Sequence, residues 1–173
     1  LVADGPEAAD PECAPRGMRC AYEFAARGQR GPVELHWHAG SDRPTQVLAE
    51  RGLEKWSNGV LFVGTKGWLC SNYDRHEIGP KEAFAGYTPL PPSIPKSVGH
   101  HREWIEACKM RTLPSCHFGY AAPLTEAVLL ANAAYRGARG KVLQWEAESL
   151  QLRGGGSLPQ ELLDAPLRTG WDC

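Results

Sequence analysis

Apolar residues dominate one helical face in the last third of the chain. Over residues 123–136 they recur at three- and four-residue intervals: Leu124, Ala127, Val128, Ala131, Ala134 and Tyr135. Such spacing is typical of a helix that packs one face on a core. Pro123 suits the first turn of a helix, and Gly137 suits its end. We therefore expect a largely buried core helix over residues 123–136.

Alternating apolar and polar residues predict several β-strands before that helix. The expected strands span residues 18–24, 33–38, 59–65, 67–73 and 75–78. Residues 25–32 contain Gly28, Gly31 and Pro32 and have the length of a hairpin connection. The last three strands follow one another closely, as in an antiparallel meander.

The remaining segments complete the expected order of elements. Residues 1–17 are rich in proline and glycine and predict an irregular lead-in. Residues 87–98 contain four prolines and predict an extended surface strap. The polar segment 51–58 is expected to be a loop. Further expected elements are a helix over 99–110, short closing strands over 142–145 and 149–152, a last helix over 157–164 and a tail over 168–173.

Single residues within these segments carry expectations of their own. In the helix over 99–110, Trp104, Ile105 and Cys108 share the face that should be buried. Ser157 is the expected N-cap of the last helix. In the tail, Trp171 is expected to pack on the body of the protein.

Strands come first in this order, and helices follow with the closing strands between them. That order is typical of an α+β fold. A length of 173 residues suits one domain with a sizeable core. We therefore expect a single α+β domain over residues 1–173, built on an open, mostly antiparallel β-sheet with helices packed on one face.

Composition argues against two classes of partner. The net charge of −1 and the pI near 6.7 provide no basic surface for nucleic acid. No apolar run approaches the roughly 20 residues that a membrane helix needs. We therefore expect neither nucleic-acid nor membrane binding.

Six cysteines are scattered along the chain without a C-x-x-C pair. In a chain of this length we expect mostly buried thiols, with disulfides or a zinc site as the alternatives. The cellular compartment stays open, with a weak preference for the reducing cytoplasm.

Histidines are the main candidates for binding chemistry. His36 and His38 fall on one face of the strand over 33–38, whereas Trp37 falls on the other. Two imidazoles at this spacing can begin a metal site, but no third ligand follows at a predictable spacing. Exposed or substrate-facing imidazoles are therefore favoured, and no metal site is expected.

Two neighbouring pairs complete the candidates. His100 and His101 are adjacent at the start of a helix, so they do not share one face; one of them is expected to cap the helix or touch a ligand, and the other to lie at the surface. Cys116 and His117 are neighbours that rarely reach the geometry of a nucleophile and its base, so no catalytic residue is expected. No G-x-G-x-x-G turn joins a strand to a helix, so no cofactor site is expected in this chain.

Several longer motifs occur in a fixed order between residues 18 and 173. They are VELHWHAG (33–40), GVLFVGTKGW (59–68), IPKSVGHHREWIEACK (94–109), SCHFGY (115–120), PLTEAVLL (123–130) and GWD (170–172). Taken together, they resemble the C-terminal domain of the bacterial branch of the Gfo/Idh/MocA family of NAD(P)-dependent oxidoreductases.

The resemblance implies a fold and a role. In that family a dinucleotide-binding Rossmann domain comes first, and a second domain, built on an open sheet, closes one sheet face over the nicotinamide and the substrate. The other face often mediates oligomer contacts, and the substrates are typically sugars, inositols and related polyols. The family's glycine-rich loop and catalytic Lys lie in the first domain, and its usual catalytic His comes early in the second domain, so the resemblance implies a position upstream of Leu1. NAD or NADP is therefore expected only for the full-length protein, and no catalytic or cofactor-binding residue is carried over.

Three functions are open at this point. The first is the substrate-side and oligomerisation domain of such an oxidoreductase, not competent for hydride transfer alone and homo-oligomeric through its sheet face. In it, Trp37 would stack on a sugar or polyol substrate, and His36, His38 and His100 would hydrogen-bond its hydroxyls. The second is a stand-alone, non-catalytic carbohydrate-binding or assembly module. The third is a metal-dependent hydrolase that uses His36 and His38.

Overall fold

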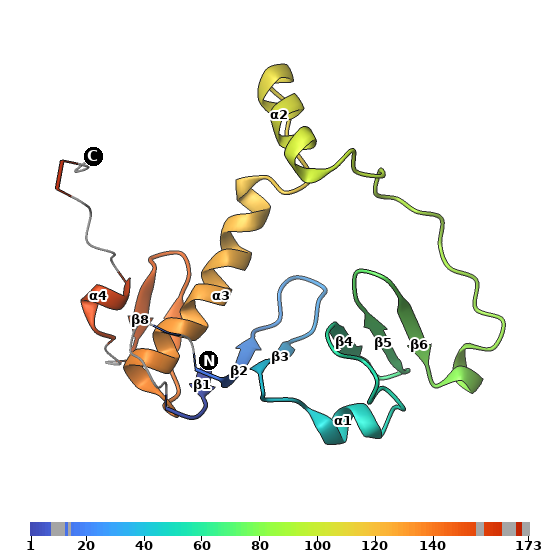
Figure 1. The fold of residues 1–173 in the computed structure, drawn as a ribbon, viewed down its shortest axis with the longest axis horizontal. Helices are drawn as coiled ribbons and strands as arrows, with labels where there is room; N and C mark the ends of the chain where they lie inside the picture. The colour runs from blue at the N-terminus through green and yellow to red at the C-terminus, as the bar shows by residue number, and fades with distance from the viewer. Residues whose placement is uncertain (8–12, 14, 155–157, 164–168, 171–173) are drawn as a thin grey trace. The chain divides into compact units, whose positions relative to one another are not determined.

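The computed structural model describes residues 1–7, 13, 15–154, 158–163 and 169–170 (Figure 1). The chain divides into two compact units, one made of Leu1–Arg43 with Ala107–Cys173 and the other of Pro44–Glu106. The single domain over residues 1–173 stays a prediction.

The first unit contains a three-stranded antiparallel sheet. Its strands are β1 (Val2–Asp4), β2 (Gly17–Phe24) and β3 (Val33–Gly40), in that order across the sheet. The hairpin β2–β3 confirms the strands expected over 18–24 and 33–38. The irregular lead-in over 1–17 is wrong at its start, because β1 pairs with β2. Three residues are too few to show alternation, and their partners lie 15 or more positions away in the sequence.

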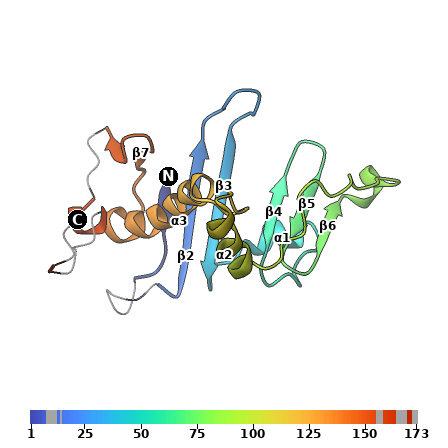
Figure 2. The same ribbon diagram turned by 90° about the horizontal axis from the view of Figure 1, so that it is seen from above.

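A long helix, α3 (Phe118–Ala138), packs against β1 and β2 and forms the main core with them (Figure 2). The hydroxyl of Tyr22 on β2 donates to the carbonyl of Ala127 on α3, at 2.6 Å. The core members from the sheet and from α3 are Ala3, Met18, Cys20, Tyr22, Ala131, Ala133, Ala134, Tyr135 and Ala138.

The helix α3 differs from the expected helix over 123–136 in three respects. It begins five residues earlier, so Pro123 lies inside it rather than at its start. It ends at Ala138, and Gly140 rather than Gly137 takes the positive φ, 72°. Its first half is exposed, with Leu124 57% accessible, so only the second half is the buried helix that the pattern predicted.

The segment after α3 closes over the edge of the sheet. Gly140 N donates to the Ala3 carbonyl, Leu143 N donates to the Leu1 carbonyl, and Leu1 N donates to the Leu143 carbonyl, each at 2.8 Å. These bonds fix β1 from its outer side.

A two-stranded sheet and a short helix follow in the same unit. They are β7 (Gln144–Glu146), β8 (Gln151–Arg153) and α4 (Gln160–Leu163). Trp145 Nε1 donates to Glu126 Oε1 of α3 at 2.6 Å, which holds the hairpin against the helix. The closing strands are confirmed with a shift of about two residues. The Ser157 cap and the Trp171 contact lie outside the described residues.

The second unit contains a small three-stranded meander with its own core. Leu53 is fully buried, and Trp56 and Cys70 are nearly so. The Arg75 guanidinium lies 4.3 Å from the centre of the Trp56 ring. The elements are α1 (Thr45–Ala49), β4 (Val60–Val63), β5 (Trp68–Ser71), β6 (His76–Gly79) and the 3-10 helix η1 (Lys81–Phe84).

These elements confirm the meander, whereas α1 and η1 were not predicted. The segment 51–58 does connect α1 to β4, but it was expected to be merely polar. It supplies Leu53 and Trp56 to the core instead.

Residues 87–98 form neither helix nor strand, in line with their prolines. The helix α2 (His100–Met110) confirms the helix expected over 99–110. Its expected inner face is wrong, because Trp104 is 63% and Ile105 50% exposed and Cys108 is also exposed, while Ala107 is buried. Helical spacing predicts which side chains share a face, but not what covers that face.

The architecture is therefore mixed, with antiparallel strands and helices, as the α+β prediction required. Within the described residues, however, the strands form three separate sheets rather than one open sheet. Local alternation predicts each hairpin, whereas the pairing of one hairpin with another depends on contacts distant in sequence. None of the described helices is both long and apolar enough to span a membrane.

The cysteine prediction is wrong for most of the described thiols. Cys20 and Cys70 are buried, but Cys13, Cys108 and Cys116 are exposed, and all five are free. Burial raises the pKa of the Cys20 and Cys70 thiols, so both are protonated and unreactive at neutral pH.

Gly40 is the residue at which β3 ends and turns. Its φ is +64°, and a Cβ atom there would lie 2.1 Å from the Arg16 carbonyl oxygen. Gly28, in the β2–β3 connection, has a φ of +59° but open space around it. The two glycines therefore share the backbone conformation and differ in the space available.

We expect Gly40→Ala to lower the free energy of unfolding by roughly 2–4 kcal/mol, because it adds a backbone clash to the conformational strain. Gly28→Ala is the matched control and should cost only about 1 kcal/mol. Urea unfolding followed by circular dichroism measures both. Equal losses would show that the contact with Arg16 is unimportant.

Candidate functional site

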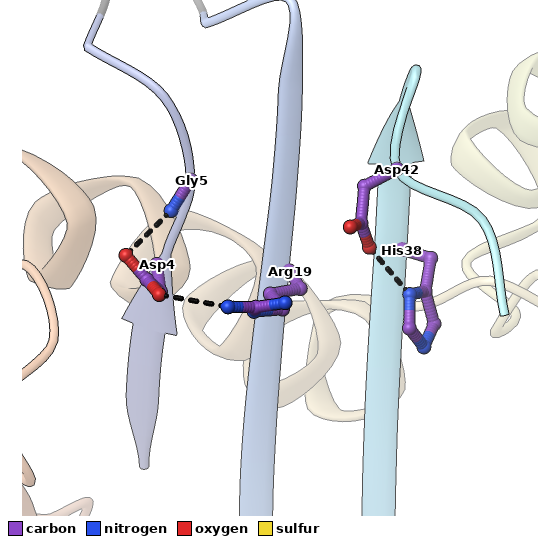
Figure 3. A network of polar contacts seen from close by, with 5 residues as sticks. All are labelled: Asp4, Gly5, Arg19, His38 and Asp42. Atoms are coloured by element: carbon purple, nitrogen blue, oxygen red, sulfur yellow. Dashed lines mark hydrogen bonds and ion pairs between the residues drawn. The ribbon is translucent and has the colours of Figure 1, made fainter.

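The candidate site lies on the face of the β1–β2–β3 sheet that points away from α3. The register places Asp4 opposite Arg19 and Arg19 opposite His38, so the three form one row across the sheet (Figure 3). Their neighbours Ala3 and Cys20 are buried in the core. Because side chains alternate along a strand, the row itself lies on the opposite, outer face.

Asp4 and Arg19 form an ion pair within this row. Arg19 Nη2 donates to Asp4 Oδ2 at 3.0 Å, and the Gly5 amide donates to Asp4 Oδ1 at 2.8 Å. The Gly5 amide first, and then the guanidinium, hold the pKa of Asp4 below its usual value. The carboxylate is therefore ionised at neutral pH, and both of its oxygens are engaged.

His38 is oriented by a carboxylate from the turn after β3. Its Nδ1 lies 2.6 Å from Asp42 Oδ2, and the two side chains are 26% and 30% exposed. The turn is held by Gly40 and by the bond from the Ser41 amide to the Arg16 carbonyl, at 2.9 Å. An ionised carboxylate only accepts hydrogen bonds, so Nδ1 carries the proton and Nε2 of the neutral ring is an acceptor.

His36 lies in the next row, opposite Ala21, which in turn lies opposite Val2. Its Nε2 is 2.7 Å from Glu34 Oε1. The structure thus brings His36 and His38 to one face, as predicted, and gives each its own carboxylate.

A cavity of about 250 Å³ opens beside these rows. Small side chains at Val2 and Ala21 leave the space that the longer polar side chains surround. Its lining residues are Val2, Asp4, Arg19, Cys20, Ala21, His36, Trp37, His38 and Gly140.

The other two predicted residues are placed differently. Trp37 is among the residues that line the cavity, but it lies opposite Cys20 in the sheet, so its side chain belongs to the helix-facing side, where it is 45% exposed. Its stacking on a ligand stays a prediction. His100 lies in the second unit, at the start of α2, with its ring 4.1 Å from that of His101. The two rings therefore lie close together, although adjacent positions on a helix do not share one face.

Sequence reasoning missed Asp4, Arg19 and Asp42. Arg19 lies on a strand that was predicted. Its polar position in the alternation, across from the histidines of the neighbouring strand, was a usable signal. Asp42 follows His38 by four residues, in a turn. Asp4 had no local signal, because its strand was not predicted.

The described residues do not support a metal site. Within them, no group of three or more His, Cys, Asp and Glu side chains is arranged to hold a metal ion. In this part of the chain the hydrolase hypothesis therefore has His36 and His38 but no further ligand.

Comparisons with models of protein families, with curated proteins and with solved structures found no match to this chain. The helices and antiparallel strands described above place the structure in the mixed helix and strand class.

The two histidines should differ in tautomer. At a pH where both rings are neutral, long-range ¹H–¹⁵N NMR should find the His38 proton on Nδ1 and the His36 proton on Nε2. Asp42→Ala should shift His38 toward the Nε2–H form and leave His36 unchanged. Glu34→Ala is the matched control and should affect His36 alone. An Nε2–H tautomer of His38 in the unmodified protein would contradict the proposed orientation.

Proposed function

We propose that this chain is the substrate-side and oligomerisation domain of an NAD(P)-dependent oxidoreductase of the Gfo/Idh/MocA family, acting on a sugar, inositol or related polyol. The observation that carries the proposal is the cavity on the outer sheet face, where three strands contribute polar side chains. The ordered motifs of the sequence support the family.

The polar groups of the cavity suit a ligand with many hydroxyls. Each hydroxyl both donates and accepts, and the cavity offers guanidinium donors from Arg19 and ring-nitrogen acceptors from His36 and His38. The volume of about 250 Å³ lies just below the roughly 300–1,000 Å³ of small-molecule sites. This size supports a single sugar or cyclitol ring rather than an oligosaccharide.

The nicotinamide cofactor would supply the hydride acceptor or donor of the full-length protein. The described strands of this chain do not fit it, because they pair antiparallel and a dinucleotide crevice is built on parallel βαβ units. We therefore place NAD or NADP on a separate domain. No residue of this chain is proposed as catalytic.

Oligomerisation through the sheet is supported by the helix-facing side of β3. Three apolar side chains alternate there and are substantially exposed, with Val33 at 56%, Leu35 at 36% and Trp37 at 45%. Contiguous apolar surface of this kind commonly marks a site that a partner covers. We propose a second copy of this chain as that partner. The five free described thiols support a reducing compartment such as the cytoplasm.

A stand-alone, non-catalytic carbohydrate-binding or assembly module is the second candidate. It is supported by the same cavity, because the polar side chains of Asp4, Arg19, His36 and His38 could bind a carbohydrate without a nucleotide. The intact mass of the native gene product distinguishes the two. A product longer by a domain, roughly 100–150 residues, supports the oxidoreductase, and a product of 173 residues supports the module.

Ligand binding tests the site itself. We expect myo-inositol or glucose to bind the chain in saturation-transfer NMR, and His38→Ala to weaken binding about fivefold, the effect of one lost hydrogen bond. His76→Ala on β6, an exposed histidine of the second unit, is the control and should change nothing. Equal affinity of the His38 and His76 variants for the ligand would show that the cavity is not the binding site.

The apolar face of β3 has a separate test. Trp37→Lys should shift the light-scattering mass toward that of a monomer, because a buried unpaired charge at an interface costs several kcal/mol. Val60→Lys on β4, at a site 52% exposed, is the control and should keep the oligomer. A monomeric unmodified chain, or an oligomer that survives Trp37→Lys, would argue against this interface.

A further inference from the structure

The outer face of the β1–β2–β3 sheet pairs every cationic or protonatable group with a carboxylate. Arg19 has Asp4 at 3.0 Å, His36 has Glu34 at 2.7 Å, and His38 has Asp42 at 2.6 Å. Glu23 lies on the same face, opposite Glu34. The three strands and the turn after β3 therefore give this face four carboxylates and one guanidinium. These groups and the two rings sum to a charge of −1 with both rings protonated and −3 with both neutral.

This balance bears differently on charged and uncharged ligands. A hydroxyl can bond to the remaining guanidinium donors or to the ring nitrogens without displacing any carboxylate. A phosphate or carboxylate ligand seeks the guanidinium fork, part of which Asp4 already occupies. It would also approach two further carboxylates, Glu34 and Asp42, at close range.

Asp4 is the member of this set that pairs with the guanidinium of Arg19. Its strand is fixed by the bond from Gly140 N to the Ala3 carbonyl, and its side chain by the Gly5 amide on Oδ1. With Oδ1 held, Oδ2 is aimed at Arg19 (Figure 3). The carboxylate is thus positioned before any ligand arrives.

From this geometry we infer that Asp4 is a specificity-determining residue: by occupying Arg19 it makes the cavity select uncharged polyols and reject phosphorylated or carboxylated ones. The inference rests on the proposed function and adds the substrate class to it. Removing the charge of Asp4 should release Arg19 and admit an anion.

The test is feasible because this ion pair contributes little to folding. The Arg19 and Asp4 side chains are 63% and 44% exposed, and solvent-exposed ion pairs contribute little to the free energy of unfolding. Asp4→Asn also keeps an oxygen that accepts the Gly5 amide bond. The variant should therefore fold, and circular dichroism verifies that it does.

The experiment measures the affinities of glucose, myo-inositol and glucose 6-phosphate for the 173-residue chain and its variants. We expect glucose 6-phosphate to bind the unmodified chain roughly tenfold more weakly than the better of the two uncharged ligands. Asp4→Asn should recover about that factor for the phosphate and leave the uncharged ligands within about twofold. Adding Arg19→Gln to Asp4→Asn should abolish the gain. Glu106→Gln, which breaks the Arg102 pair at 2.7 Å on α2, is the matched control.

The outcomes separate this inference from the proposed function. If the unmodified chain binds an uncharged ligand but Asp4→Asn gains no affinity for glucose 6-phosphate, the role of Asp4 is overturned and the proposed function stands. Equal binding of phosphate and uncharged ligand by the unmodified chain has the same meaning. If neither kind of ligand binds any folded variant, both fail.

A measurement on the unmodified chain covers the case of a misfolded variant. Rejection of the phosphate should weaken as salt rises from roughly 0.05 to 0.5 M, because mobile ions screen the carboxylates of this face. A rejection that does not change with salt would be steric, and the inference would be wrong.

Discussion

The close packing of α3 on β1 and β2 is the constraint on which the first unit depends. The second half of the helix contributes Ala131, Ala134 and Ala138 to the core, and the sheet contributes Ala3 and Cys20 to the same core. The side chains between α3 and β1 are small, whereas β2 adds the larger Met18 and Tyr22 to the same core, and a close-packed core has little tolerance for added volume. An extra methylene group in such a core costs roughly 1–3 kcal/mol. The helix therefore fixes the position of the sheet and, through it, the direction in which every outer side chain points.

The site follows from the same strands by alternation. Ala3 and Cys20 point to the core, and the next residues along each strand, Asp4 and Arg19, point outward. A shift of register by one residue would bury the charged row and expose the core, which makes the register strongly specified. Because core and cavity share the same three strands, the packing under α3 is also what aligns Asp4, Arg19 and His38.

Local patterns in the sequence predicted the elements that are stabilised locally. The β2–β3 hairpin, the β4–β5–β6 meander and α2 all appear close to their expected limits, and so does the shared face of His36 and His38. Each depends on residues a few positions apart.

The failures concern contacts between residues distant in sequence. β1 is only three residues long and is held by its pairing with β2, in which Ala3 lies opposite Cys20. Its own sequence is too short to show the alternation that predicts a strand. The early start of α3 at Phe118 places a proline inside the helix, against the ordinary preference for the first turn. Trp37 was assigned correctly to the face opposite the histidines, and the same alternation that placed it there separates its ring from theirs. Of the three residues in the outer row, His38 was therefore predicted as a site residue from the sequence, whereas Arg19 and Asp4 were not.

The bonds that join Leu1 to Leu143 have a consequence for the time course of folding. They join residues 142 positions apart and so close a loop that contains the whole second unit, and ordering so long a loop is slow because its entropy is lost before its contacts form. The β2–β3 hairpin, with Arg19, His36 and His38 already on one face, can form early from neighbouring residues. Asp4 can join them through the pairing of β1 with β2. The outer edge of β1 acquires its bonds only when the segment after α3 has returned to the sheet, so the edge of the strand that carries Asp4 is completed by the last long-range closure.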